Sequence, residues 1–417
     1  MNKFILSCFR FSLSLHDDNV FLTMIVNPFT TTLLRWYEQH GRSLPWRATH
    51  DPYTIWLSEI ILQQTRIEQG LPYWERFMQR FPTVNALAEA SEDEVLRLWQ
   101  GLGYYSRARN LHKAARQVVA QGGFPQTYEG LRALKGVGDY TAAAIGAFAF
   151  GLPVAAVDGN VYRVLARHFG IDAPIDTTQG KRLFTELAQS LLPPDRAADF
   201  NQAMMDFGAT CCTPNSPQCA SCPLLESCEA WHSKRISELP VKLRKATVKN
   251  RHLSYIYIRC KGEIAVRRRP SGDIWQGLWE VPLVEGGKKE PLPGAPSSLP
   301  PLWEATSPSK ESFSSKSEAS PSGGRLEGAP NDSSIHQLNT NPLLTQLLKS
   351  KHVILLKSGV RHVLTHRILL SDFYLLEVDE RPPLPDEYIW IHESSFDDYA
   401  KPRLMEMLME TLSAYRI

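Results

Sequence analysis

The most informative stretch in the first half of the chain is Leu134-Lys135-Gly136-Val137-Gly138. A predicted helix ends near Leu134 and a second begins near Asp139, so two glycines form the turn between them. Glycines let another molecule approach the main chain closely, and the start of the second helix offers unpaired N–H groups and a favourable dipole. The stretch therefore predicts a helical hairpin that binds a phosphate at Gly136 and Gly138. A plain corner between two packed helices explains this motif, taken alone, equally well.

Four cysteines lie downstream of the hairpin and close to one another, at Cys212, Cys219, Cys222 and Cys228. Thiolates suit iron–sulfur clusters and zinc, and the short spacers keep the chain near one metal centre. Ordinary buried cysteines are a poor explanation, because these four clustered residues make up more than half of the chain's seven cysteines. Zinc sites usually contain two C-x2-4-C pairs, whereas only Cys219 and Cys222 form one, so an iron–sulfur cluster is favoured.

The composition predicts an enzyme of two or three domains that works in a reducing compartment. The 417 residues carry a formal net charge of +2, so a nucleic-acid surface has to be a local patch. The cysteines cluster as ligands and do not spread as a disulfide framework, which favours the cytoplasm. The uncharged run 141–157 contains two glycines and a proline and is too short to span a membrane, so it predicts a buried helix followed by a turn.

The pattern along the chain predicts two domains and a linker. Residues 27–231 have helical periodicity and form an all-α domain. Residues 232–251 are basic and contain proline, as linkers do. Residues 252–417 form an α+β or α/β domain, with strands at 253–259, 353–356 and 374–378 and a closing helix at 402–415.

Two further segments are predicted not to pack. Residues from about 286 to 340 are rich in Ser, Pro and Gly, which indicates a disordered insertion in the second domain. Residues 1–26 precede the domain-like pattern and include a second methionine, Met24. We interpret them as a disordered extension or a misplaced start.

Two carboxylates lie in contrasting settings. Glu59 lies inside an apolar helix, 55–62, where desolvation raises the pKa of a carboxyl group. Asp158 precedes a helix that runs to Phe169, and N-cap bonds are expected to keep it ionised. A proton-bearing acid and a charged partner are the pair that glycosidic cleavage uses. The alternatives are a partly exposed helix residue for Glu59 and a purely capping role for Asp158.

These features resemble the MutY family of A/G-specific adenine DNA glycosylases, in the endonuclease III superfamily. The resemblance covers about residues 28–284 and implies an all-α helix-hairpin-helix glycosylase domain with a 4Fe-4S cluster, acting on adenine opposite 8-oxoguanine or guanine. The matching motifs, besides the hairpin and the cysteines, are Leu44-Pro45-Trp46-Arg47, Trp56-Leu57-Ser58-Glu59, Leu62-Gln63-Gln64-Thr65, Gly101-Leu102-Gly103-Tyr104-Tyr105-Ser106-Arg107-Ala108-Arg109 and Val157-Asp158-Gly159-Asn160.

The resemblance implies roles at the matched positions. Adenine has to leave the base stack before its glycosidic bond is accessible. Glu59 then protonates adenine N7, Asp158 stabilises the oxocarbenium-like sugar, and water completes the hydrolysis. Gln64 fills the vacated space and Tyr104 wedges beside the lesion pair. The remaining matches are Tyr140 and Asn160, which assist catalysis, Arg42, Trp46 and Gln202 in the adenine pocket, and Arg47, Thr65 and Arg107 on the substrate and DNA side.

The second domain resembles the Nudix-like module that recognises 8-oxoguanine. Its best-matched stretch is Trp275–Pro282, and the R-E-x-x-E-E pyrophosphatase box does not follow it, which predicts recognition without nucleotide hydrolysis. Val363-Leu364-Thr365-His366 stands where the family commonly has Phe-Ser-His, so Thr365 keeps a hydroxyl and His366 keeps the ring. The aromatic residue is replaced by Leu364.

Two other functions were weighed against this one. The first is a bifunctional glycosylase and lyase acting on oxidised pyrimidines, which needs a lysine where this chain has Tyr140. The second is a metal-stabilised DNA-binding protein without catalysis, in which Glu59 is incidental. The favoured hypothesis is a monomeric, monofunctional enzyme acting on double-stranded DNA, with no membrane association. The sequence leaves open the preference between 8-oxoguanine and guanine, the role of the insertion and any protein partner.

Overall fold

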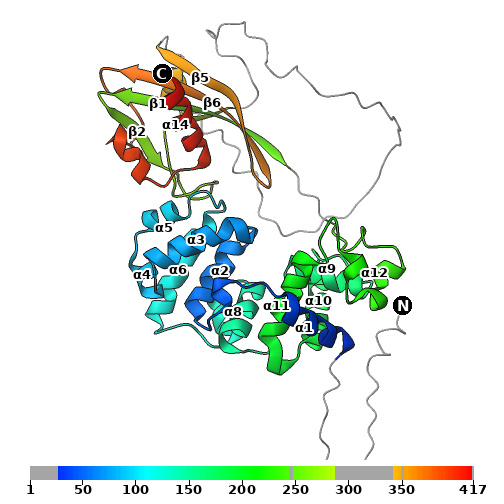
Figure 1. Cartoon of the computed structure of the whole chain (residues 1–417). Helices are drawn as coiled ribbons and strands as arrows, with labels where there is room; N and C mark the ends of the chain where they lie inside the picture. The colour runs from blue at the N-terminus through cyan, green and yellow to red at the C-terminus, as the bar shows by residue number, and fades with distance from the viewer. Residues whose placement is uncertain (1–26, 244–247, 287–340, 349–351, 416–417) are drawn as a thin grey trace, which may run out of the picture. The chain divides into compact units, whose positions relative to one another are not determined.

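The computed structural model describes residues 27–243, 248–286, 341–348 and 352–415 (Figure 1). The predicted extension 1–26 and nearly all of the predicted insertion 286–340 lie outside the described residues. The chain forms two compact units. The first comprises Met1–Ile55, Pro125–Arg132 and Val137–Leu243, and the second Trp56–Phe124, Ala133–Gly136 and Arg244–Ile417. No helix among the described residues combines the length and the apolar character that crossing a membrane requires.

The first unit is helical. Its core contains α1, α9, α10 and α11, from which Leu33, Leu165, Phe184 and Phe200 are at most 1% exposed. The helices of this unit are α1 (Pro28–His40), the start of α2 (Pro52–Leu62), α7 (Tyr128–Ala133), α8 (Asp139–Phe150), α9 (Gly159–His168), α10 (Thr178–Leu191), α11 (Ala197–Thr210) and α12 (Glu229–His232), with short 3-10 turns at Pro45–Arg47, Pro194–Arg196, Cys219–Ser221 and Leu225–Ser227.

Local sequence signals set the ends of these helices. Asn27 accepts a hydrogen bond from the Phe29 N–H at the start of α1, and the Thr177 hydroxyl accepts from Gly180 at the start of α10. Helix α8 ends at Gly151, whose φ of 64° is a left-handed conformation that glycine adopts without strain. The uncharged run predicted to be a buried helix followed by a turn is therefore α8 and the segment after it.

The second unit begins with helices that carry an aromatic core. Phe77, Phe81 and Trp99 are fully buried, and the Phe77 ring meets the other two edge-on at centroid distances of 5.9 and 5.8 Å. Such pairs add to the stabilisation from burial. The helices are the rest of α2, α3 (Ile67–Arg80), α4 (Val84–Glu89), α5 (Glu92–Leu98) and α6 (Ser106–Ala120).

The remainder of the second unit is a mixed sheet, with β1 parallel to β6 and the other paired strands antiparallel. The order is β3-β2-β1-β6-β5, with β4 also paired to β1 and β7 to β2. The described elements are β1 (Lys249–Cys260), β2 (Glu263–Arg268), β3 (Trp279–Glu280), β4 (Leu283–Gly286), α13 (Pro342–Leu348), β5 (Val353–Val363), β6 (Arg367–Val378), β7 (Tyr388–His392), a 3-10 turn at Glu393–Asp398 and α14 (Arg403–Tyr415).

Strand β1 is central, and its two faces belong to different cores. Tyr255 and Tyr257 pack in the cluster that includes Leu408 of α14, whereas Ile256 and Ile258 pack in the cluster on the other face. Side chains alternate along a strand, so a strand covered on both sides reads as a continuous apolar run. Figure 1 shows α14 lying against the sheet. The three predicted strands and the closing helix are confirmed, although β1 begins at Lys249, inside the predicted linker.

Candidate active site

Asp158 is the N-cap of α9, as the sequence predicts, and its carboxylate is held by three hydrogen bonds. Oδ1 accepts from the backbone N–H groups of Asn160 and Val161, both at 2.8 Å. Oδ2 accepts from the Asn160 side-chain amide, also at 2.8 Å. Helix N-termini favour negative charge, so the position suits a carboxylate. The arrangement fixes both oxygens and leaves the group little freedom to rotate.

The pKa of Asp158 differs from the expectation. Burial raises it and outweighs the hydrogen bonds from Val161 and Asn160 and the charge of Arg163, which all lower it. The sequence predicts an ionised group, because the N-cap bonds are readable in the sequence whereas the dry surroundings are not. A carboxylate in this state gains most from a nearby positive charge.

Arg163 ties the start of α9 to two other segments. Its guanidinium donates to the Asn160 side-chain oxygen and to the Gly208 carbonyl of α11, each at 2.7 Å. Its Nε donates to the Cys212 carbonyl at 2.8 Å. One buried arginine therefore connects the residue that bonds Asp158 to the first cysteine of the cluster motif.

The second arginine of α9, Arg167, holds the cysteine loop. Its Nη1 lies 3.5 Å from the Cys212 sulfur and 2.7 Å from the Thr213 carbonyl, and Nη2 donates to Pro214 at 2.9 Å. The Cys228 thiol donates to the Arg167 carbonyl at 3.7 Å. Two positive side chains thus face a segment in which thiolates would accumulate negative charge.

The four predicted metal-ligating cysteines lie close enough to influence one another. Burial first, and then the charges of Cys212 and Cys222, raise the pKa values of the Cys219 and Cys228 thiols. A hydrogen bond from Cys211 lowers the pKa of Cys222 to about 7. Within the part of the chain that the structure describes, no three His, Cys, Asp or Glu side chains are arranged to hold a metal ion.

The donor set fits a thiolate-bound cluster in type and number. Four thiols in one loop suit a soft metal centre, and Arg163 and Arg167 supply compensating charge and hydrogen bonds beside it. Hydrogen bonds to ligating sulfurs are one of the ways in which a protein tunes such a centre. The sequence did not single out these arginines, although both follow Asp158 on α9 at helical spacing.

A buried carboxylate, Asp206 of α11, organises two of the predicted binding residues, Arg42 and Arg47. Arg47 donates to both of its oxygens at 2.8 Å, and Arg42 donates through its backbone N–H and its Nε, each at 2.9 Å. The Asp206 side chain is fully buried. Burial alone would raise its pKa, but the two arginines hold the pKa below the ordinary value. Arg42 and Arg47 are therefore oriented before any ligand arrives.

Other predicted pocket residues lie in the same unit. The Gln202 side-chain oxygen accepts a 2.5 Å hydrogen bond from the Tyr37 hydroxyl. Trp46 is 6% exposed, and the Tyr140 hydroxyl lies 3.8 Å from the sulfur of Met205. The chain brings Arg42, Arg47 and Gln202 together through α11, where Gln202 and Asp206 are one helical turn apart.

Glu59 lies on α2 among apolar neighbours, as predicted. Residues 53–58 and Ile60 and Ile61 are buried, whereas Glu59 itself is half-buried. The helix is apolar on nearly every face, so Glu59 is the one carboxylate in its sequence. Its role as a proton donor remains a prediction.

Gln64 and Tyr104, the two residues predicted to enter the base stack, share an unusual backbone. Their φ angles are 57° and 46°, in the left-handed region that side chains other than glycine rarely adopt. Gln64 is exposed in the turn after α2, and Tyr104 is 46% exposed. Strained residues of this kind cluster at functional sites. Gln64 therefore lies outside the regular helix, and Tyr104 lies outside the core.

Arg107 holds both of these turns. Its Nη1 donates to the carbonyls of Ile60, Ile61 and Gln63 at 2.5 to 3.1 Å, and its Nη2 lies near two carbonyls of the loop before Tyr104. Desolvation lowers its pKa to about 10. The predicted role of Arg107 on the DNA side stays a prediction, and its contacts show that it supports both turns. Thr65 follows Gln64, and its hydroxyl lies 3.4 Å from the Gln63 carbonyl.

The hairpin between α7 and α8 has the predicted form. Gly136 has a φ of 80°, and a Cβ there would lie 2.7 Å from the Cβ of Asn110. Gly138 has no such neighbour and is exposed at the start of α8. Val137, between them, is 7% exposed and anchors the turn. The turn can thus present its backbone N–H groups outward.

Thr365 and His366 are exposed in the turn between β5 and β6. The Thr365 hydroxyl is hydrogen-bonded to the Tyr104 hydroxyl. The Lys249 N–H donates to the His366 carbonyl at 3.1 Å, which ties the turn to the start of β1. The two residues predicted to contact the base opposite adenine and the predicted wedge, Tyr104, are therefore neighbours.

Comparison with known proteins identifies both parts of the chain. A family model for HhH-GPD superfamily base excision DNA repair proteins matches residues 57–190, and a NUDIX domain model matches residues 254–411. The adenine DNA glycosylase of Buchnera aphidicola subsp. Acyrthosiphon pisum is 34% identical over 267 residues, which are 63% of this chain and 76% of that protein.

Similarity extends to proteins of other organisms. The adenine DNA glycosylase of Homo sapiens is 46% identical over 216 residues, which are 49% of this chain and 40% of the human protein, so the match spans less than half of that relative. Among solved structures, a thermostable thymine-DNA glycosylase is 31% identical with a TM-score of 0.46, over 49% of this chain and 95% of that structure.

Gly208 of α11 is expected to be intolerant of any side chain. A Cβ at this position would lie 2.6 Å from the Cβ of Asn160, close to the backbone of α9. Overpacking of this kind costs about 1–3 kcal/mol, so Gly208→Ala is expected to lower the free energy of unfolding by that amount. The neighbouring exposed residue offers the control, because Ala209→Ser should change stability by less than about 0.5 kcal/mol. Urea unfolding measures the free energy of unfolding of both variants. A Gly208→Ala protein as stable as the unsubstituted protein would contradict the prediction.

Proposed function

The chain belongs to the adenine DNA glycosylase family, and we propose that it hydrolyses the N-glycosidic bond of adenine opposite 8-oxoguanine or guanine. It is a DNA glycosylase of the base excision repair superfamily, and DNA is its partner. The observation that carries the proposal is the Asp158 carboxylate, fixed by three 2.8 Å hydrogen bonds in a desolvated position. A fixed anion of this kind stabilises a cation that develops beside it.

In the proposed reaction the bond between the sugar C1′ and adenine N9 breaks, and its electron pair leaves with the base. Glu59 supplies a proton to adenine N7, which makes adenine a neutral leaving group. Asp158 faces the positive charge that develops on the sugar, and water then adds to C1′ and loses a proton. The apolar surroundings of Glu59 on α2 support its role as the acid.

Recognition of the extruded adenine is assigned to Arg42, Trp46 and Gln202, and Arg47 is assigned to the substrate and DNA side. Asp206 holds both arginines by charge-assisted hydrogen bonds, so neither has to be ordered when the base arrives. Gln64 and Tyr104 are proposed to occupy the stack that adenine leaves, from backbone conformations that are already strained. Tyr140 and Asn160 assist beside Asp158.

Contacts to the rest of the duplex follow from exposed groups. Gly136 and Gly138 are proposed to bind a phosphate at the start of α8, where Gly138 is the N-cap and provides no side-chain hydrogen bond to the helix. Thr365 and His366 are proposed to contact the oxidised guanine opposite adenine. The hydroxyl contact between Thr365 and Tyr104 supports this assignment, because Tyr104 is the proposed wedge beside the same base pair.

Cys212, Cys219, Cys222 and Cys228 are proposed to hold a 4Fe-4S cluster. When bound, the cluster would cross-link the loop 212–228 and stabilise it. Arg163 and Arg167 connect that loop to α9, and thereby to Asn160 and Asp158.

A substitution at Glu59 tests the proposed catalysis. Glu59→Gln removes the proton donor and leaves the size of the side chain unchanged, so adenine excision from a duplex with adenine opposite 8-oxoguanine should fall by about 100-fold or more. Duplex affinity should stay within about twofold of the unchanged protein. Glu68→Gln, at an exposed position of α3, is the matched control. Single-turnover kinetics measures the excision rate of each protein. If the unsubstituted protein removes no adenine, the non-catalytic DNA-binding alternative is favoured.

Tyr140 predicts base removal without strand cleavage. A lyase needs an amine that forms a Schiff base with the opened sugar, and this position carries a phenol instead. Incubation of the protein with substrate duplex and borohydride should therefore yield no appreciable covalent complex. Efficient trapping would favour the bifunctional alternative.

The pH dependence of the rate tests the role of Asp158. Hydrogen bonds from Asn160 lower the pKa of Asp158, so Asn160→Ala should raise it further. A larger fraction of Asp158 is then protonated at a given low pH, and the acid limb of the single-turnover rate should move to higher pH. The measurement compares rate profiles of the two proteins at saturating enzyme. Superimposable acid limbs would show that Asp158 does not control the rate.

A further inference from the structure

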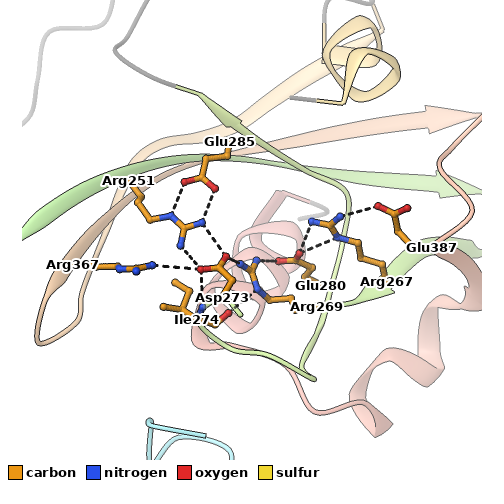
Figure 2. A network of polar contacts seen from close by, with 9 residues as sticks. All are labelled: Arg251, Arg267, Arg269, Asp273, Ile274, Glu280, Glu285, Arg367 and Glu387. Carbon is orange, nitrogen blue, oxygen red and sulfur yellow. Dashed lines mark hydrogen bonds and ion pairs between the residues drawn. The ribbon is translucent and has the colours of Figure 1, made fainter. Parts of the chain in front are cut away.

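Asp273 is an acceptor shared by three arginines in the second unit (Figure 2). Arg251 Nη1 donates to its Oδ1 at 2.6 Å, Arg269 Nη2 donates to its Oδ2 at 2.5 Å, and Arg367 Nη1 lies 3.4 Å from Oδ1. The Ile274 N–H also donates to Oδ1, at 2.7 Å. A single carboxylate thus bonds residues that are far apart in the sequence.

The three arginines come from different parts of the sheet. Arg251 lies on β1 and is also bonded by Glu285 of β4 through two hydrogen bonds of 2.6 Å. Arg367 begins β6, directly after the turn that carries Thr365 and His366. Arg269 follows β2, is 5% exposed and pairs with the fully buried Glu280. Figure 2 shows the guanidinium groups of all three pointing toward Asp273.

Asp273 also belongs to a tight loop between β2 and β3. Arg269 Nε donates to the Ile274 carbonyl at 3.0 Å, and the Gly277 N–H donates to the Arg269 carbonyl at 3.0 Å. Trp275 has a φ of 61°, so the loop needs support to keep its shape. Near its end the loop contacts helix α6, where Arg109 donates a 2.5 Å hydrogen bond to the Gln276 carbonyl.

The β5–β6 turn is bonded by its backbone on both sides. The Leu364 N–H donates to the Arg367 carbonyl at 2.8 Å, and the Lys249 N–H donates to the His366 carbonyl at 3.1 Å. Arg367 and Arg251 are the residues through which Asp273 reaches these two strand ends. Asp273 therefore links the loop 269–278 to the turn that carries Thr365 and His366.

We propose that Asp273 is a positioning residue for recognition of the base opposite adenine, acting through Arg367 and Arg251 on the 364–366 turn and through Arg269 on the 269–278 loop. The inference rests on the proposed function, which assigns Thr365 and His366 to that base. Asp273 itself does not touch DNA in this role. It sets where the turn stands relative to Tyr104, the residue that Thr365 contacts.

Charge makes the carboxylate necessary at this position. Burial would raise the pKa of Asp273, but Arg251 and Arg269 lower it to about 2, so the group stays ionised throughout the working range of pH. Without that charge, three guanidinium groups would converge with less compensation, and their mutual repulsion would favour separation of the strand ends. An amide at position 273 keeps the shape and removes the charge, which isolates this effect.

Amide hydrogen exchange of the full-length protein tests the positioning without relying on activity. Asp273→Asn should raise exchange about tenfold at residues 364–366, at Lys249 and at residues 274–278, since loss of an ion network lowers the free energy of local opening. Glu263→Gln is the control, because it removes a more exposed acid of the same sheet that pairs with Arg381. Arg367→Gln, a milder change, should raise exchange in the 364–366 turn and leave the 274–278 loop protected. Unchanged exchange at the turn in both Asp273→Asn and Arg367→Gln would overturn the proposal.

Opposite-base preference supplies the second measurement. The ratio of dissociation constants for duplexes with 8-oxoguanine or guanine opposite an uncleavable adenine analogue should fall about fivefold in Asp273→Asn. In a Thr365→Ala background the same substitution should have little further effect, because both act through one turn, whereas general destabilisation would be additive. Additive effects, or a ratio that Asp273→Asn leaves intact, would overturn the proposal. Failure of the proposed function is distinguishable, since the unsubstituted protein would then show no preference or remove no adenine.

Discussion

The guanidinium of Arg163 is the connection on which the proposed catalytic end of the first unit depends. It bonds the Asn160 side chain, the Gly208 carbonyl and the Cys212 carbonyl, so helix α9, helix α11 and the cysteine loop meet at one side chain. A guanidinium has five donors in a fixed plane, which suits it to hold several carbonyls at once. Arg163 fixes the Asn160 side chain, and Asn160 in turn donates a hydrogen bond that fixes the Asp158 carboxylate. Gly208 lets α11 approach Asn160 closely enough for the connection to form.

Carboxylates paired with arginines recur elsewhere among the described residues: Asp206 and Glu280 are fully buried, and the Asp273 side chain is 30% exposed. Asp206 holds Arg42 and Arg47 in the first unit, and Asp273 and Glu280 hold arginines of the sheet in the second. A buried ion pair is a weak source of stability, because desolvation offsets most of the attraction. It does impose one geometry, since any other arrangement leaves a charge without a partner. These ion pairs lie beside the proposed pocket and the recognition turn, where the arginine side chains have to be held in one fixed geometry.

The turns that carry Gln64 and Tyr104 use a different device. Both residues adopt left-handed backbone conformations, and Arg107 bonds the carbonyls around them. The support comes from one side chain on α6, so the two turns are held in a fixed relation to each other. Strain of this kind keeps exposed side chains from settling into ordinary packing, and an enzyme that inserts side chains into a base stack needs them outside its own core.

Much of the fold and part of the candidate site could be predicted from interactions between residues close together in the chain. Asp158 caps a helix because its side chain reaches N–H groups two and three residues ahead, and the apolar run of β1 records burial on both faces. The hairpin, the closing helix and the grouping of four cysteines are readable in the same way. The roles of Thr365, His366 and Glu59 came from resemblance to a family and stay predictions.

Tertiary packing alone decided the rest. Arg42 and Asp206 are 164 positions apart, and no local rule pairs them. Asp273 receives arginines from β1 and β6, so its importance exists only once the sheet has formed. The raised pKa of Asp158 has the same origin, because capping is a property of adjacent residues whereas desolvation depends on everything that packs around the carboxylate. Hydrogen bonds between residues close in the chain can therefore be predicted from the sequence. The exclusion of water from a side chain depends on tertiary packing.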